Sequence, residues 1–126
     1  MVEERYSPKI LIVDDEPMLC QSYQRYLSRT GYEVEIAISA KDGLKLIRSF
    51  KPDVIIADIQ MPKMDGFQFA EAVWKNNPQQ KIIFSSGFAY VYDINIRLEK
   101  ENLIFFRKPA RLVEDLLYSI KKALKE

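Results

Sequence analysis

Short apolar runs alternate with longer amphipathic segments along this chain, and no other feature constrains its fold as much. Five apolar runs predict strands, namely Lys9–Val13, Tyr32–Ile38, Asp53–Ala57, Lys81–Ser85 and Leu103–Phe106. Apolar residues at steps of three and four predict helices over 17–31, 40–50, 66–76 and 112–125, with a less clear loop and short helix over 90–101. This order favours an α/β fold, in which helices cover both faces of a five-stranded parallel sheet.

The chain is predicted to form one domain, because no linker, repeat or low-complexity tract interrupts the pattern. Its 126 residues are enough to bury a core without disulfides or metal, and 48% of them are apolar. We therefore expect a single domain over residues 1–126, with its packed part at about 9–125. Pro17 suits the first turn of the first helix, Ser39 suits the N-cap of the second, and Pro78 ends the third.

Composition excludes several classes of function. The net charge is +1, from 19 basic and 18 acidic residues, so we predict that this domain binds neither nucleic acid nor a membrane. The absence of histidine excludes Ser-His-Asp and Cys-His catalysis and any histidine-ligated metal. The single cysteine, Cys20, permits no intrachain disulfide and is predicted to be a small buried helix side chain. The N-terminus lacks the apolar segment of a signal peptide, which favours a cytoplasmic, reducing location.

Acidic residues stand where two of the apolar runs end. Asp14 and Asp15 follow the first run, and Asp58 follows the third. The carboxyl ends of parallel strands meet at one edge of a sheet, so we expect these three carboxylates to lie together. Clustered carboxylates repel one another, and partial burial raises the cost. A hard divalent cation would relieve the repulsion, and Mg²⁺ suits a site with a few carboxylates and several waters.

Two further strand ends add hydroxyl groups and an ammonium group at the same edge. The fourth strand ends near Ser85 and Ser86, and Lys108 follows the fifth. Each residue taken alone has an ordinary structural explanation, as an N-cap, a turn residue or a surface lysine. Taken together, carboxylates, Mg²⁺, a hydroxyl and a lysine form a layout that holds a phosphoryl group while one carboxylate attacks phosphorus.

Four motifs stand at these strand ends: VDDE at 13–16, PDVIIADIQMPKMDG at 52–66, FSSG at 84–87 and FFRKP at 105–109. They are separated by 43 residues from Asp15 to Asp58, 28 from Asp58 to Ser86, and 22 from Ser86 to Lys108. In combination, over almost the whole chain, they resemble the receiver domains of two-component response regulators, the CheY-like branch of the flavodoxin-like fold. This resemblance implies a doubly wound sheet with strand order 2-1-3-4-5.

The resemblance implies a role for each matching residue. Asp58 would be the phosphoacceptor, taking a phosphoryl group from a phosphohistidine on a sensor histidine kinase or a histidine phosphotransfer protein. Asp15 and Asp58 would bind Mg²⁺ directly, with Mn²⁺ as a substitute, and Asp14 would bind it through water. The backbone carbonyl of Gln60 would be a further metal ligand. Lys108 would pair with a phosphoryl oxygen.

The resemblance also implies a conformational switch. Ser86 occupies the switch hydroxyl position and is preferred over Ser85 because Gly87 then supplies the small residue that follows it. Phe105 matches the aromatic position that moves inward when the hydroxyl moves. Such a domain is not an enzyme for a separate substrate, although it catalyses its own phosphorylation and dephosphorylation. It changes a protein-binding surface, so its downstream target would be another protein.

The sequence departs from the family's pattern after the fourth strand. Phe88 either shields the aspartyl phosphate from water or packs elsewhere. Residues 90–96 are unusually apolar, which fits local packing or a partner surface. The partner would be a downstream protein, or a second copy in a homodimer through the fourth helix, fifth strand and fifth helix.

Four alternatives remain open at this point. The chain is either a stand-alone receiver or a receiver fragment of a longer regulator whose output domain is absent here. A flavodoxin-like electron carrier would share the fold, but the acids after the first strand would repel the FMN phosphate. A haloacid dehalogenase-type phosphatase would carry an Asp-x-Asp pattern after that strand, where this chain has adjacent acids. A receiver that no longer accepts phosphate disagrees with the complete set of Asp15, Asp58, Ser86 and Lys108.

Overall fold

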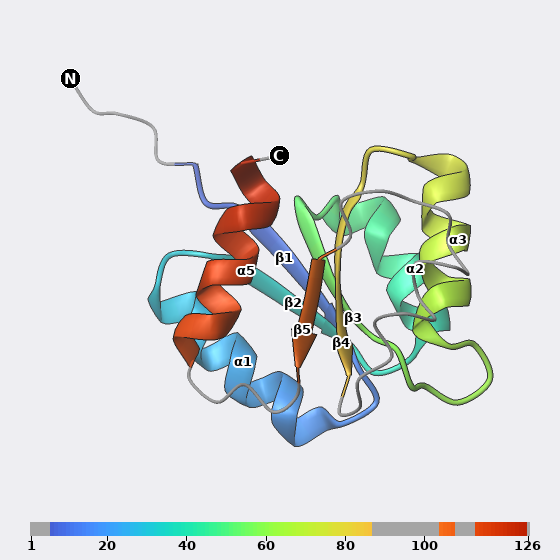
Figure 1. The fold of residues 1–126 in the computed structure, drawn as a ribbon, viewed down its shortest axis with the longest axis horizontal. Coiled ribbons are helices and arrows are strands. Elements are labelled where there is room, and N and C mark those ends of the chain that lie inside the picture. The colour runs from blue at the N-terminus through green and yellow to red at the C-terminus, as the bar shows by residue number, and fades with distance from the viewer. Residues whose placement is uncertain (1–5, 87–103, 108–112, 126) are drawn as a thin grey trace.

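The computed structural model describes residues 6–86, 104–107 and 113–125, and within them five parallel strands form one sheet (Figure 1). The strand order is β2-β1-β3-β4-β5, which confirms the predicted order. The strands are β1 (Lys9–Val13), β2 (Glu33–Ala37), β3 (Val54–Asp58), β4 (Lys81–Ser86) and β5 (Ile104–Arg107). The helices, labelled as in Figure 1, are α1 (Pro17–Arg29), α2 (Ala40–Phe50), α3 (Gly66–Asn76) and α5 (Val113–Lys125).

Helices cover both faces of the sheet, as predicted. α1 and α5 lie on one face, and α2 and α3 lie on the other (Figure 1). Successive side chains of a strand point to opposite faces, so each central strand contributes to two cores. In β3, Ile55 and Ala57 pack toward α2 and α3, whereas Val54 and Ile56 pack toward α1 and α5. This two-sided burial explains why the third apolar run is continuous instead of alternating.

Three strands, β3, β4 and β5, end one residue later than predicted. β3 includes Asp58, which lies opposite Ser85, and β4 includes Ser86, which lies opposite Arg107. The backbone of a strand continues to pair after its apolar side chains stop, so side-chain polarity does not mark where the strand ends. Asp58 and Ser86 are therefore held by strand backbone and not by a loose turn.

Helix starts follow the local signals in the sequence. Pro17 is the first residue of α1, and the Ser39 side chain accepts a hydrogen bond from the Asp42 N–H at 3.1 Å, which confirms the predicted N-cap. Asp65 caps α3 with a reciprocal pair of hydrogen bonds to Gln68, a capping box. The residue before α1, Glu16, makes no such side-chain bond, so α1 begins without a polar cap.

Several predictions concern residues outside the described part of the chain. They include Phe88, residues 90–96 and Lys108, and for Phe105 the structure describes the backbone of β5 alone. Within residues 6–86, 104–107 and 113–125, none of the helices combines the length and the apolar character that crossing a bilayer requires.

Candidate functional site

The structure brings three of the predicted site residues together at the carboxyl edge of the sheet. Asp14 follows β1 and Asp58 ends β3, and these two strands are neighbours in the sheet. Asp14, Asp15 and Asp58, called the acid cluster below, each offer a carboxylate oxygen within 4.8 Å of the others. Asp14 is 3% exposed and Asp58 is 4% exposed, whereas Asp15 is open to solvent. The cluster therefore combines two buried acids with one accessible acid.

Backbone hydrogen bonds orient the two buried acids. The Glu16 N–H donates to Asp14 Oδ1 at 3.0 Å, and the Gln60 N–H donates to Asp58 Oδ1 at 3.2 Å. In both cases an aspartate accepts from the backbone two residues further along, which fixes the carboxylate relative to its own turn. The buried Cys20 thiol also donates to the Asp14 carbonyl at 3.4 Å, and its burial confirms the prediction made for this residue.

The chemistry of the acid cluster fits a hard divalent cation. Three carboxylates this close repel one another, and the repulsion is weakly screened where two of them are buried. Oxygen ligands at this spacing suit Mg²⁺, which binds through a few carboxylates and keeps several waters. The exposed Asp15 leaves a side of the cluster open to solvent. The residues present therefore fit the predicted Mg²⁺ site.

Two serines lie beside Asp58 on the next strand. Ser85 is directly opposite Asp58 in the parallel register, and its carbonyl accepts from the Ile59 N–H at 2.9 Å. Ser86 follows as the last residue of β4, and both serines are buried. The predicted switch residue Ser86 is thus at the same sheet edge as the acid cluster. Its role as the switch hydroxyl remains a prediction from the resemblance.

Gly66 packs directly against the backbone at the end of β3. A Cβ atom on Gly66 would lie 2.8 Å from Ile59 Cα and closer still to the Asp58 carbonyl oxygen. The start of α3 is therefore pressed against the backbone of the residue predicted to accept phosphate. The sequence places Gly66 at the end of the motif PDVIIADIQMPKMDG, but the close approach to the Asp58 backbone is visible only in the structure.

Comparison with known proteins agrees with this geometry. Residues 10–120 match the model of a family described as the response regulator receiver domain. The transcriptional regulatory protein AfsQ1 of Streptomyces coelicolor is 30% identical over 104 residues, which cover 82% of this chain and 46% of AfsQ1. The chain spans less than half the length of the curated relatives that it matches first.

Solved structures share the fold over nearly the full chain. A CheY-like receiver domain protein from Methanospirillum hungatei has a TM-score of 0.84 at 32% identity, covering 95% of each chain. The response regulator TrrA from Thermotoga maritima, in complex with Mg(2+)-BeF, has a TM-score of 0.81 at 28% identity, covering 93% of this chain and 99% of TrrA. These matches set aside the flavodoxin-like and phosphatase alternatives. The chain belongs to the response regulator receiver domain family.

Proposed function

We propose that Asp58 accepts a phosphoryl group from a phosphohistidine on a sensor histidine kinase or a histidine phosphotransfer protein. The observation that carries this proposal is the acid cluster, in which Asp58 ends a buried strand with Asp14 and Asp15 within 4.8 Å. A buried carboxylate beside two others lowers the stability of the protein when no cation is bound. A phosphoacceptor site that binds a cation accounts for why the three acids are placed together.

In the proposed reaction an Asp58 carboxylate oxygen attacks the phosphorus atom. A P–O bond forms as the P–N bond to histidine breaks, and the imidazole nitrogen keeps the bonding electron pair. The Gln60 N–H, 3.2 Å from Asp58 Oδ1, holds the carboxylate in one orientation for this attack. Burial of Asp58 limits the access of water to the resulting aspartyl phosphate.

Asp15 and Asp58 would hold Mg²⁺ directly, with Asp14 acting through water and the Gln60 backbone carbonyl as a further ligand. The ion, or Mn²⁺ in its place, would neutralise charge on the phosphoryl oxygens. Asp14 is well placed for an indirect role, because its Oδ1 already accepts from the Glu16 N–H at 3.0 Å. The TrrA structure, solved with Mg(2+)-BeF, supports the choice of Mg²⁺ by family likeness.

The remaining roles are extended from the family resemblance. Lys108 would pair with a phosphoryl oxygen, Ser86 would bond the phosphoryl group, and Phe105 would move inward with it. Phosphorylation would thereby shift an existing equilibrium between two conformations and promote or weaken binding to a downstream protein. The domain would promote its own phosphorylation and dephosphorylation, and it would not act on a separate substrate.

The output of this receiver is proposed to be a protein-protein interaction in the cytoplasm. One such interaction would be a homodimer through the fourth helix, β5 and α5. The apolar residues 90–96 are the proposed contact. The domain itself is not proposed to bind nucleic acid, given its net charge of +1. The matched part of the chain covers less than half of each of the first curated relatives, so the alternative form of the proposal is a receiver domain within a longer regulator.

The test is the intact mass of the protein after incubation with Mg²⁺ and acetyl phosphate. Wild type should gain one phosphoryl group, and the gain should disappear in Asp58→Asn and on addition of a chelator. Asp42→Asn removes an exposed acid from the first turn of α2, away from the cluster, and should be phosphorylated like wild type. No gain in wild type, or an equal gain in Asp58→Asn, would contradict the proposal.

A further inference from the structure

The loop between β3 and α3 returns the chain tightly onto Asp58. Eight residues after Asp58, the Gly66 N–H donates to the Ile59 carbonyl at 2.9 Å. Between them, Lys63 adopts a left-handed backbone conformation with φ of 69°, and the Met64 N–H donates to the Pro62 carbonyl at 2.7 Å. These constraints leave the start of α3 little freedom relative to the end of β3.

The contact at Gly66 leaves no room for a side chain. A Cβ atom there would lie 2.8 Å from Ile59 Cα, 3.0 Å from the Asp58 carbonyl carbon, and closer still to the Asp58 carbonyl oxygen. All three neighbours are backbone atoms, which cannot rotate away as a side chain can. Any larger residue at this position therefore has to displace α3 or the backbone of Asp58 and Ile59.

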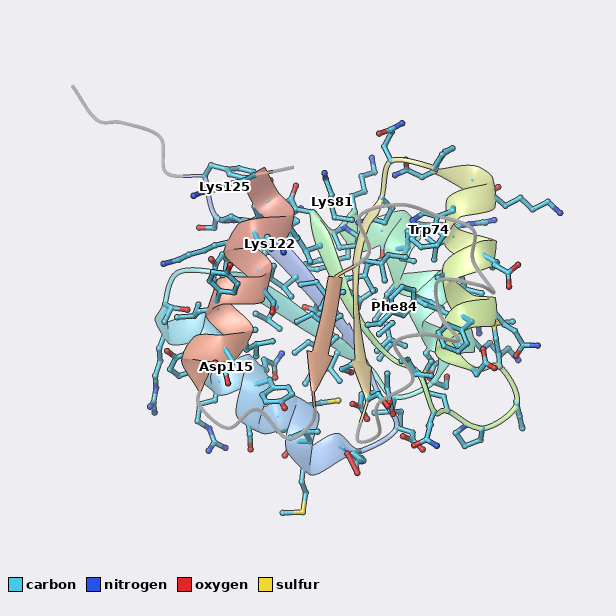
Figure 2. All side chains as sticks on the ribbon, in the orientation of Figure 1. Trp74, Lys81, Phe84, Asp115, Lys122 and Lys125 are labelled. Atoms are coloured by element: carbon cyan, nitrogen blue, oxygen red, sulfur yellow. The ribbon has the colours of Figure 1, made fainter. Side chains whose placement is uncertain are left out.

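Helix α3 is also anchored to the sheet by its aromatic side chains, which opposes its movement away from β3. The Phe67 ring packs against Phe84 of β4 with ring centroids 5.9 Å apart. Trp74 and Phe84 lie together between α3 and the sheet, with centroids 6.2 Å apart (Figure 2). Phe84 is opposite Ala57, the residue before Asp58. Displacement caused by a larger residue at Gly66 would thus fall on the turn that follows Asp58.

That turn contains the groups on which the proposed reaction depends. The Gln60 N–H holds Asp58 Oδ1 at 3.2 Å, and the same residue supplies the carbonyl predicted to bind Mg²⁺. We propose that Gly66 and Asp65 are positioning residues for the phosphoacceptor, an inference that rests on the proposed function. Gly66 permits the close approach, and the Asp65 capping box keeps the first turn of α3 in place against it.

The test compares two variants of this contact with two matched controls. Gly66→Ala should slow phosphorylation by acetyl phosphate at saturating Mg²⁺ by up to about 100-fold, a cost that a displacement of about 1 Å in a reacting group can reach. Gly43→Ala is the control, because its new Cβ would meet side-chain atoms of Phe69 and Val13, both at 3.0 Å, which can shift. It should remain within about twofold of wild type, a limit well below the effect of that 1 Å displacement.

The second pair keeps the test valid if Gly66→Ala does not fold. Asp65→Ala removes the N-cap of α3, and Ser39→Ala removes the N-cap of α2, which follows β2, a strand that β1 separates from β3. The two substitutions should lower the free energy of unfolding by similar amounts. Asp65→Ala should also weaken Mg²⁺ binding and slow phosphorylation by about 10-fold, less than Gly66→Ala, because it displaces the Asp58 backbone less. Ser39→Ala should change neither quantity.

The two levels of the account fail in different ways. If wild type gains no phosphoryl group, the proposed function is wrong. If wild type is phosphorylated and folded Asp65→Ala and Gly66→Ala match it in rate and Mg²⁺ affinity, the positioning role is wrong. An equal slowing in Ser39→Ala would also overturn it, since the effect would then follow from lost stability alone.

Discussion

The two edges of the sheet differ in whether their polar groups attract or repel one another. At the amino edge, Asp53 Oδ2 accepts from the Lys9 N–H at 2.7 Å, and Gln80 Nε2 donates to the carbonyls of Pro52 and Lys81 at 3.2 and 3.3 Å. At the carboxyl edge, the acid cluster places three like charges within 4.8 Å. The amino edge is thus built for the stability of the protein alone. The carboxyl edge retains a repulsion that a bound cation would remove.

Charged residues on the helices extend the same contrast. Lys122 and Lys125 lie in the last turn of α5 and Lys81 begins β4, whereas Asp115 lies toward the other end of α5 (Figure 2). The helices run against the strands, so their C-termini meet the amino edge of the sheet (Figure 1). Cations there complement the negative ends of the helix dipoles, which stabilises the amino edge further.

The largest expected effect is at the amino edge, in Gln80→Leu. The buried Gln80 amide also lies 3.5 Å from the Asp53 carbonyl, and leucine has a similar size but no donor. We expect a loss of about 2 kcal/mol in the free energy of unfolding, because buried carbonyls lose their partners. The measurement is urea unfolding, with the exposed Gln79→Leu as the control. Equal stability of Gln80→Leu and Gln79→Leu would show that this edge is not held as described.

The second effect is at the same edge, in Asp53→Ala. This change removes the acceptor of the Lys9 N–H and should cost about 1.5 kcal/mol, the usual range for a hydrogen bond to a charged group. Asp53→Asn keeps an oxygen acceptor and should recover part of the loss. Urea unfolding of both variants is the measurement. An Asp53→Ala protein as stable as wild type would contradict the stabilising role given to the amino edge.

The third effect has the opposite sign and is at the carboxyl edge. Asp58→Asn removes one of three clustered charges and should raise the free energy of unfolding by about 1 kcal/mol without divalent cations. Asp42→Asn makes the same chemical change at the exposed first turn of α2 and should slightly destabilise the protein. The measurement is urea unfolding of wild type and both variants in the presence of a chelator. An Asp58→Asn protein less stable than wild type would mean that the cluster carries no net repulsion.

The smallest effect is at Tyr6, beside Asp53. The hydrogen bond to the Asp53 carboxylate, with burial and the negative charge of Asp53, raises the pKa of Tyr6 from 10.0 to about 12. The folded state therefore favours the protonated phenol, so this contribution is present below pH 10 and disappears as the pH rises through about 12. Because Tyr6 is 70% exposed, Tyr6→Phe should cost at most about 0.5 kcal/mol.

The pH dependence of that difference is the check on Tyr6. Wild type and Tyr6→Phe should differ by a constant amount from pH 7 to about pH 10 and converge near pH 12, as unfolding curves can measure. A difference that grows with pH in this window would show that the phenol and the Asp53 carboxylate do not interact in the folded protein.

Much of the fold followed from local signals in the sequence. β1 spans Lys9–Val13 and α3 spans Gly66–Asn76, as predicted, because a charged residue, a helix cap or a proline bounds each segment. The gathering of the three carboxylates was also predictable, since parallel topology alone brings strand ends to one edge. What each acid does there remains a prediction from the family resemblance.

The contacts that the sequence did not reveal join distant parts of the chain. Gln80 bonds to the Pro52 carbonyl across 28 residues, and no spacing or propensity marks a glutamine for such a position. The approach of Gly66 to the Asp58 backbone is equally a matter of packing. Local sequence patterns specify the helices and strands and their order, whereas these contacts depend on how the helices and strands pack in the folded protein.

The most direct test of the contrast between the edges is the free energy of unfolding with and without Mg²⁺, at matched ionic strength. At ten times its dissociation constant, Mg²⁺ should stabilise wild type by about 1.4 kcal/mol, because it binds the folded acid cluster and not the unfolded chain. Asp53→Ala should gain the same amount and Asp58→Asn much less. Wild type unchanged by Mg²⁺, or Asp58→Asn stabilised as much as wild type, would contradict the account.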